Sequence, residues 1–364
     1  MPAGYVRRLD LRADEIKRIV VRGTNWVGDA VMTIPALREL RRVMPHQHIT
    51  LITRPNTADI FLDAEFIDDL IIYQRSGFRS ACGQIRQWQG QKYDLALLLQ
   101  NAFQAAAIAF LARVPTRIGY DVDRRRVLLT HPVALPDWKD TRHEVFYYLN
   151  LVAELERLVY GSSGIADCEP RLGINISAHR REGARQILHQ QGARNDAPLI
   201  LLCPGSINSR AKRWPAESYA ALADQLIETG ANVALLGSPS EIEVSREVCR
   251  RMRQQPILLT GKTTVAEAVA IISVADILIT NDTGPAHVGA AAGTPTLVIF
   301  GPTNPLTTRP LAPTAEIIRR PPECAPCMLR DCPIDHRCMT AITPEEVFDR
   351  ARAILSRRQI EVTA

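Results

Sequence analysis

The chain has 364 residues, of which 46% are hydrophobic and 23% are charged, and its formal net charge is +5. This length is too great for one ordinary hydrophobic core and predicts two domains, while the composition excludes an intrinsically disordered protein. The modest net charge gives no indication of nucleic-acid binding. The amino-terminal residues are charged and lack an apolar core, so we expect no signal peptide. No apolar run approaches the roughly 20 residues of a membrane span, so we expect a protein that is cytoplasmic and soluble, or at most peripheral to a membrane.

The first half of the chain alternates apolar strands with helices. Segments typical of buried strands occur at residues 19–21, 49–53, 70–73 and 94–99. Helices are predicted at about 30–43 and 142–160, and a turn-rich stretch at 161–170 indicates a linker. Strands that alternate with helices in this way imply a mostly parallel, doubly wound sheet.

The same order of elements starts again after the linker. Strands are predicted at 199–202, 233–236, 257–259, 277–279 and 296–300. The helix from 217 to 229 ends at Gly230, which favours a left-handed cap. The two halves share an architecture but no sequence. We therefore predict an α/β protein with two Rossmann-like, doubly wound domains that face each other across a cleft, with polar residues gathered at the carboxyl ends of the strands.

Residues 274–305 form the most informative segment. An apolar strand at 277–279 ends in the sequence Asn281-Asp282-Thr283-Gly284, and Pro285 can begin a helix because its missing N–H falls in the first turn. The free N–H groups of a helix that starts just beyond a strand favour an anionic ligand. Thr283 adds a hydroxyl, and the Asp282 carboxylate could hold a sugar or ribose hydroxyl. An ordinary crossover with a polar loop is the alternative interpretation.

Two other positions carry residue types suited to group transfer. Asp29 ends a strand-to-helix turn in which Gly28 permits a tight bend, and it could serve as a general base. Helix capping by Asp29 is the alternative, and no dinucleotide fingerprint follows the turn. Lys212 and Arg213 lie in a loop after the first strand of the second half, where two cations could neutralise phosphate oxygens without a metal. A solvated basic loop is the alternative there.

Three segments in this order resemble a known family: RGTNWVGDAVMTIPALRELRRVMP (22–45), PGSINSRAKRWP (204–215) and ITNDTGPAHVGAAAGTPTLVIFGPTNP (279–305). They are similar to the ADP-heptose:lipopolysaccharide heptosyltransferases of glycosyltransferase family 9, and residues 323–347 are most similar to the heptosyltransferase II branch. The resemblance spans nearly the whole chain. It implies a GT-B fold and an inverting, metal-independent transfer of heptose from ADP-L-glycero-β-D-manno-heptose to the heptose of the lipopolysaccharide inner core. No cofactor is implied, and the partners are this donor and a Kdo/heptose-lipid A acceptor.

The resemblance also assigns individual residues. Asp29 matches the proposed general base, Lys212 matches the lysine at the donor phosphates, and Asp282 matches the acidic residue that contacts the donor sugar. The implied donor-binding residues are Gly28, Ser206, Lys212, Arg213, Glu241, Thr263, Asp282, Thr283, Gly284 and His287. The candidate acceptor-binding residues are Asn25, Gln100, Asn101, Arg124 and His143. Among these, Gln100 and Asn101 follow a predicted strand and could hold acceptor hydroxyls. Arg124 and His143 could meet the anionic inner-core sugars.

The implied domains are an acceptor-binding domain over 1–170 and a nucleotide-sugar-binding domain over 171–343. Thr343 and Glu346 form the pattern of a capping box at the start of a final helix. We expect this helix, 344–364, to return to the first domain.

Four of the eight cysteines fall in one segment, at Cys324, Cys327, Cys332 and Cys338, with His336 among them. In a cytosolic chain such spacing favours zinc or redox chemistry over structural disulfides. Similar cysteines occur in the resembled branch without an established metal requirement, so we expect a structured or partly reduced loop and no metal.

Two other functions stay in competition. A related glycosyltransferase with another ADP-sugar or glycan acceptor would carry the same machinery. A non-catalytic nucleotide- or zinc-binding protein belongs to a different class, and the presence of both Asp29 and Lys212 argues against it, because a pure binder needs no base.

Overall fold

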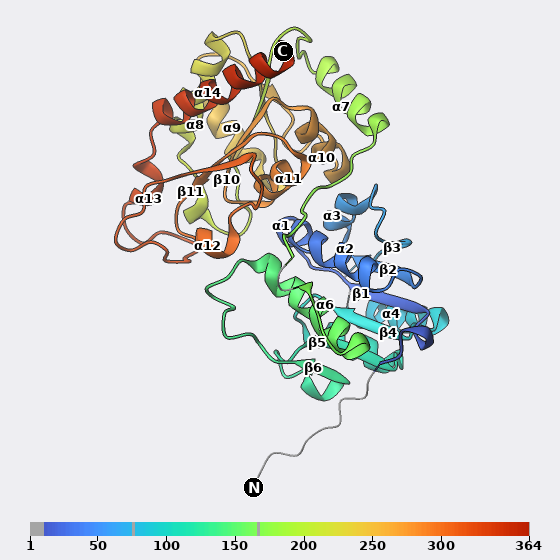
Figure 1. Ribbon diagram of the computed structural model, residues 1–364. Coiled ribbons are helices and arrows are strands. Elements are labelled where there is room, and N and C mark those ends of the chain that lie inside the picture. The colour runs from blue at the N-terminus through green and yellow to red at the C-terminus, as the bar shows by residue number, and fades with distance from the viewer. Residues whose placement is uncertain (1–10, 75–76, 166–167, 364) are drawn as a thin grey trace. The chain divides into compact units, whose positions relative to one another are not determined.

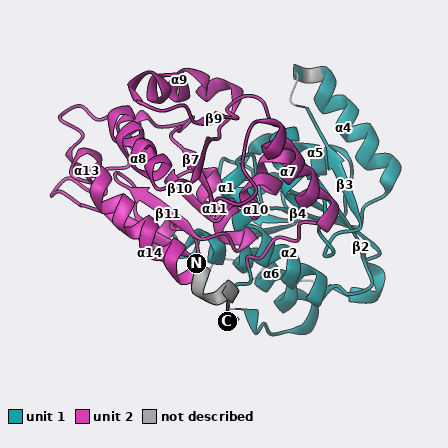
Figure 2. Cartoon of the chain, turned by 90° about the horizontal axis from the view of Figure 1, so that it is seen from above, with its two compact units in different colours: residues 1–171 teal, residues 172–364 magenta. Residues whose placement is uncertain are grey.

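The computed structural model describes residues 11–74, 77–165 and 168–363, and the chain divides into two compact units, Met1–Arg171 and Leu172–Ala364 (Figure 1). Figure 2 shows the two units in separate colours. Each unit has its own buried hydrophobic cluster and is described here by itself.

The described part of unit 1 contains a six-stranded sheet with the order β3-β2-β1-β4-β5-β6, and every neighbouring pair is parallel. The strands are β1 (Arg18–Arg22), β2 (His48–Thr53), β3 (Asp69–Ile72), β4 (Leu95–Leu98), β5 (Thr116–Tyr120) and β6 (His131–Val133). The apolar runs identified β1 to β4. The pairing register sets Arg22, the last residue of β1, opposite Ile52 of β2 and Leu98 of β4. The carboxyl ends of these three strands therefore meet at one edge.

The helices of unit 1 cover the two faces of this sheet. They are α1 (Val27–Met32), α2 (Ile34–Val43), α3 (Pro55–Ala58), α4 (Gly77–Gln91), α5 (Phe103–Leu111) and α6 (Glu144–Tyr160). The single helix predicted over 30–43 is in fact interrupted at Thr33, whose hydroxyl donates to the carbonyl of Ala30 at 2.7 Å. This bond occupies a helical carbonyl, and Pro35 in the next turn has no N–H to continue the ladder.

The described part of unit 2 also contains a six-stranded parallel sheet, with the order β12-β11-β10-β7-β8-β9. Its strands are β7 (Leu199–Cys203), β8 (Asn232–Leu235), β9 (Ile257–Leu258), β10 (Ile277–Asn281), β11 (Thr296–Phe300) and β12 (Ala315–Arg319). Every residue of β7, β10 and β11 is buried, as their apolar runs at 199–203, 277–279 and 297–300 predict for a sheet covered on both faces.

The helices of unit 2 pack on both faces of its sheet. They are α7 (Ala178–Gln190), α8 (Ala216–Glu228), α9 (Ile242–Arg251), α10 (Val265–Val274), α11 (Gly284–Ala292), α12 (Pro305–Thr308), α13 (Arg337–Thr340) and α14 (Pro344–Thr363). Short 3-10 turns occur at Arg210–Lys212 and Pro239–Glu241. Gly230, just after α8, has a φ of 89°, the left-handed conformation that its position predicts.

The final helix, α14, differs from our expectation. Thr343 caps it, since its hydroxyl accepts the N–H of Glu346 at 3.2 Å. However, Val347 and Ala351 are fully buried in the same hydrophobic cluster as Ile299 of β11, and α14 lies beside α8 (Figures 1 and 2). The helix therefore belongs to unit 2. This placement corrects the expectation that helix 344–364 joins the first domain, because its apolar stripe covers the sheet of unit 2.

No helix in the described ranges is long and apolar enough to cross a membrane.

Candidate functional site

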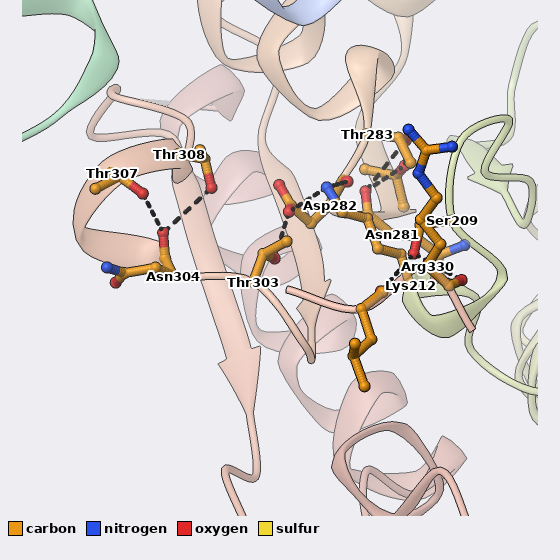
Figure 3. A network of polar contacts seen from close by, with 12 residues as sticks. Ser209, Lys212, Asn281, Asp282, Thr283, Thr303, Asn304, Thr307, Thr308 and Arg330 are labelled. Carbon is orange, nitrogen blue, oxygen red and sulfur yellow. Dashed lines mark hydrogen bonds and ion pairs between the residues drawn. The ribbon is translucent and has the colours of Figure 1, made fainter. Parts of the chain in front are cut away.

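Lys212 and Asp282 form an ion pair at the carboxyl edge of the unit 2 sheet. The Lys212 ammonium lies 2.9 Å from Asp282 Oδ2 and 3.1 Å from the carbonyl oxygen of the same residue. The Thr303 hydroxyl donates to the same Oδ2 at 2.6 Å (Figure 3). The side chain of Asp282 is 3% exposed and that of Lys212 is 26% exposed. One buried carboxylate thus fixes a lysine whose side chain is still partly exposed.

Asn281 holds the loops around this pair together. It is fully buried, and its Oδ1 accepts from the Trp214 N–H at 3.0 Å and the Tyr219 hydroxyl at 3.1 Å. Its Nδ2 donates to the carbonyls of Pro204 at 2.9 Å and Gly205 at 3.1 Å. The side chain of Asn281 therefore uses all its capacity to tie the end of β10 to the loop after β7. Asn281 lies in the segment 279–305 that carries the family resemblance, but the sequence alone did not predict this role for it.

The start of α11 lies next to the ion pair. Thr283 is its N-cap residue, and Pro285 stands in the first turn as predicted. Gly289 packs against the sheet so closely that a Cβ there would lie 2.5 Å from the hydroxyl oxygen of Thr296. Thr283 and Gly284 are partly exposed, whereas His287 is buried. The N–H groups of the first turn thus open near Lys212, which is a favourable arrangement for an anion.

Glu241 lies against the backbone of the loop after β7. Its Oε2 accepts from the N–H and the hydroxyl of Ser238, both at 2.8 Å. A Cβ on Gly205 would lie 2.0 Å from Glu241 Oε1, so only glycine permits this approach. Arg213 donates to the carbonyl of Ser206 at 2.8 Å and 3.2 Å, and it therefore braces the loop.

The predicted donor-binding residues of unit 2 follow adjacent strands. Lys212 and Ser206 lie in the loop after β7, Glu241 comes after β8, and Thr263 after β9, while Asp282 follows β10. Because β10, β7, β8 and β9 are neighbours in a parallel sheet, all these positions lie along the same edge. Unit 2 brings this set together.

Asp29 and Gly28 lie in unit 1, in the first turn of α1. The N-cap residue of α1 is Trp26, so Asp29 is the third helical residue and not the N-cap residue. Burial raises the pKa of the Tyr148 hydroxyl, and the nearby Asp29 carboxylate adds to this rise. Asp29 therefore lies close to α6. Its role as a base stays a prediction.

The acceptor candidates Asn25 and Gln100 contact a buried arginine and its aromatic neighbour. Gln100 Oε1 accepts from Arg22 Nε at 3.2 Å, and Asn25 Oδ1 accepts from the Tyr73 hydroxyl at 3.2 Å. The Arg22 guanidinium carbon lies 3.4 Å from the centre of the Tyr73 ring. Sequence reasoning missed Arg22. The signal was a charged residue directly after the apolar run 19–21.

The arginine cluster 124–126 does not form one solvated face. Arg124 is exposed, but Arg125 is fully buried and donates to the carbonyls of Tyr120 at 2.8 Å and Gln100 at 2.6 Å. Arg125 also donates to Asn101 Oδ1 at 2.8 Å. Burial lowers the pKa of Arg125. This arginine therefore fixes the loop that carries both acceptor candidates after β4.

His143 has a structural contact. It is the N-cap residue of α6, and its ring accepts the N–H of Val145 at 3.2 Å. Its role toward an acceptor stays a prediction.

The cysteine-rich segment supports the turn that carries Lys212. The N–H of Ala211 donates to the carbonyl of Arg330 at 2.9 Å, and the ring of His336 bonds the Ala211 carbonyl at 2.6 Å. The Ser209 hydroxyl bonds the carbonyls of Leu329 and Arg330, both at 3.2 Å (Figure 3). Residues 329–336 therefore hold the 3-10 turn in place through hydrogen bonds.

The cysteines of this segment differ in exposure. Cys324 is exposed, Cys327 and Cys332 are partly exposed, and Cys338 is buried. Burial, with smaller effects from the other three thiols, raises the pKa of Cys338 to about 11. Within the described ranges, no group of three or more His, Cys, Asp or Glu residues is arranged to hold a metal ion.

Comparison with known proteins decides the family. The model of glycosyltransferase family 9 (heptosyltransferase) matches residues 84–337. The chain belongs to glycosyltransferase family 9. As a family 9 member it is an enzyme that transfers glycosyl groups, and the family carries the GT-B fold expected from the sequence.

Several family 9 relatives align with most of the chain. Lipooligosaccharide heptosyltransferase 2 of Haemophilus influenzae is 30% identical over 83% of this chain and 88% of its own length. Lipopolysaccharide heptosyltransferase 2 of Escherichia coli is 28% identical over 93% and 98% of the two chains.

Two solved family 9 structures have the same fold. The structure of E. coli ADP-heptose lipopolysaccharide heptosyltransferase II has a TM-score of 0.80 and 26% identity, covering 94% of this chain and 99% of that chain. The family 9 glycosyltransferase of Veillonella parvula has a TM-score of 0.80 and 27% identity, covering 95% and 98%. The two Rossmann-like units expected from the sequence are confirmed.

Proposed function

We propose that the chain transfers a heptose from ADP-L-glycero-β-D-manno-heptose to the heptose of the lipopolysaccharide inner core, a transfer of the heptosyltransferase II type. The observation that carries this proposal is the similarity to proteins named heptosyltransferase 2 over up to 93% of the chain. The ion pair of Lys212 with Asp282 beside the start of α11 supports it, because these groups suit a nucleotide diphosphate.

In the proposed mechanism, the donor phosphates bind at Lys212 and at the N–H groups of Thr283 and Gly284. As the bond between heptose and ADP breaks, negative charge grows on the phosphate oxygens, and these fixed donors stabilise it. Asp29 acts as the general base, and it takes the proton from the acceptor hydroxyl as that oxygen attacks the anomeric carbon. A single displacement of this kind inverts the anomeric centre and needs no metal.

Asp282 has a positioning role in this mechanism. Its carboxylate accepts from both Lys212 and Thr303, so it holds the ammonium at the edge of the sheet before the donor arrives. A lysine fixed in advance loses less conformational entropy when it binds the phosphates.

The test is release of ADP from the ADP-heptose, with and without a Kdo-lipid A acceptor that carries one heptose. We expect acceptor-dependent release by the wild type, a loss of at least about a hundredfold in Asp29→Ala, and wild-type rates for Asp137→Ala, which removes an exposed carboxylate of the same unit. EDTA is expected to leave the rate unchanged. Release that survives equally in Asp29→Ala would contradict its role as the base.

A second candidate is transfer of another ADP-sugar or transfer to another glycan, because pocket shape sets the identity of the sugar. Measurable ADP binding without release from any heptose donor and acceptor would favour this candidate.

The proposed acceptor is a lipid, so we also propose a cytoplasmic enzyme that contacts the inner membrane peripherally during transfer. Co-sedimentation with vesicles that contain the acceptor tests this. Binding that depends neither on the acceptor nor on anionic lipid would contradict it.

A further inference from the structure

Arg22 is a buried cation without an anionic partner. The residue is 2% exposed, and its hydrogen bonds go to the neutral oxygens Gln84 Oε1 at 3.0 Å and Gln100 Oε1 at 3.2 Å. Burial lowers its pKa to about 10; the Tyr73 hydroxyl opposes this shift, and the neighbouring Arg54 cation adds to it. Burying a charge is unfavourable unless an opposite charge offsets it, and the charged side chain that acts on Arg22 here, that of Arg54, is also a cation.

Arg54 has an unpaired hydrogen-bond donor at the same edge of the sheet. It directly follows β2, which pairs with β1, so it lies beside the strand end that carries Arg22. Its Nε is buried and has no hydrogen-bond partner. The hydroxyl of Thr24, a residue 6% exposed, is also buried without a partner. Buried polar groups in proteins nearly always have partners, so these atoms point to a ligand that the free chain does not hold.

In the described residues, no carboxylate forms an ion pair or hydrogen bond with Arg22 or Arg54. Tyr73 stacks on Arg22 and stabilises the cation, but an aromatic ring offsets only part of the cost of burying a charge. Guanidinium groups present several N–H donors that match the oxygens of phosphate and carboxylate groups. Arg22 uses only its Nε and Nη1 donors in the hydrogen bonds described.

We propose that Arg22 and Arg54 form an oxyanion subsite in unit 1 that binds a phosphate or carboxylate group carried by the acceptor sugar. The subsite adjoins Gln100 and, through Tyr73, Asn25, which are the residues that sequence reasoning assigns to the acceptor. That the anion belongs to the acceptor rests on the proposed function. The anion-binding chemistry rests on Arg22 and Arg54 alone.

The first experiment measures the thermal midpoint of the whole chain with inorganic phosphate, glucuronate or neutral mannose, at constant ionic strength set with chloride. We expect phosphate or glucuronate to raise the midpoint of the wild type, and mannose to have no effect, because only a ligand of the folded state shifts the equilibrium. A response to phosphate alone identifies a phosphate site, and a response to glucuronate alone identifies a carboxylate site.

The variants locate the effect. Arg22→Gln and Arg54→Gln are expected to lose the shift, whereas Arg113→Gln is expected to keep it. Arg113 is an exposed arginine just before β5, at the opposite edge of the same sheet, so this control makes the same charge change. Arg54 is only partly buried, so Arg54→Gln keeps the test open if Arg22→Gln fails to fold. A shift that persists in both variants belongs to another site, such as the Lys212 turn, and overturns the proposal. A wild type that responds to neither anion also overturns it.

A kinetic experiment separates this inference from the proposed function. With the heptose-bearing acceptor, Arg22→Gln is expected to raise the acceptor KM by at least about tenfold, with the donor KM unchanged. Transfer by Arg22→Gln with an unchanged acceptor KM would contradict the subsite and leave the proposed function intact. Loss of the anion shift in Arg22→Gln without any heptose transfer would keep the subsite and reject the proposed function.

Discussion

At the residue scale, Lys212 is fixed by a partner that is 70 positions away in the sequence. The family resemblance identified Lys212 and Asp282 separately, each as a contact to the donor. The structure shows in addition that the two side chains bind each other. Sequence spacing could not reveal this, because the contact depends on how β7 and β10 pair in the sheet.

The Thr303 hydroxyl tests how far Asp282 depends on its neighbours. Thr303→Val keeps the shape of the side chain but removes the hydrogen bond to the buried carboxylate. We expect the free energy of unfolding to fall by about 1–3 kcal/mol, as for hydrogen bonds to charged groups. Chemical denaturation measures this loss.

The matched control is Thr307→Val. Thr307 is similarly buried, but its hydroxyl bonds the neutral carbonyl of Asn304 at 3.1 Å. A smaller loss, of about 1 kcal/mol, is expected there. Equal losses in the two variants would show that the charge of Asp282 adds nothing to the bond.

Arg22 and Arg125 illustrate the limit of prediction at this scale. An arginine in a sequence is most often solvated, but Arg22 and Arg125 are buried. Burial of Arg125 depends on the carbonyls of Tyr120 and Gln100, which come together only in the folded sheet. Composition and spacing contain no record of such partners.

At the scale of elements, the loop after β7 and the 3-10 turn Pro239–Glu241 meet without any space between them. Gly205→Ala would place a methyl group 2.0 Å from Glu241 Oε1, so the Glu241 side chain, which accepts from the N–H and the hydroxyl of Ser238, must move. We expect a loss of about 1–3 kcal/mol in stability and weaker binding of ADP in titration calorimetry. The control is Gly183→Ala in α7, where a Cβ meets nothing within 4 Å. That change is expected to stabilise by about 0.5–1 kcal/mol. Undiminished ADP binding by Gly205→Ala would separate this loop from the donor site.

The cysteine-rich segment should react unevenly with alkylating reagents. The thiolate is the reactive form, so at pH 8 a thiol with a pKa of about 11 is ionised to only roughly 0.1%. We expect iodoacetamide to modify the exposed Cys324 well before Cys338, with the rate at Cys338 rising as the pH approaches 11. Peptide mass spectrometry follows each site, and denatured protein, in which all eight cysteines react, is the control. Equal rates in the native chain would contradict the burial of Cys338.

The strands show which elements a sequence can predict. β7, β10 and β11 each contain an apolar run of at least three residues, and the predicted strands lie on these runs. β5 and β6 were missed because Arg117 and Pro132 interrupt any apolar pattern. Pro132 lies in the edge strand of the sheet, where a missing N–H is tolerated. Their strand conformation comes from pairing with neighbours, which local sequence does not encode.

At the scale of the whole molecule, the two units have separate hydrophobic clusters, and we expect two unfolding transitions in calorimetry. ADP should raise the unfolding temperature of unit 2 and leave that of unit 1 unchanged. Val347→Ala removes two methyl groups from a fully buried side chain of α14. It should lower the free energy of unfolding of unit 2 by about 1–3 kcal/mol. If Val347→Ala instead lowered the stability of unit 1, the assignment of α14 to unit 2 would be wrong.

Residues 329–336 form an exposed loop whose length is constrained by its contacts with the turn that carries Lys212. Exposed loops usually tolerate insertions, and relatives often differ in length there. In this chain the carbonyls of Leu329 and Arg330 and the ring of His336 hold the turn that ends at Lys212. An added residue between these positions would shift one anchor against the other. The segment therefore has little freedom to change length during evolution, although none of its residues is assigned to a substrate.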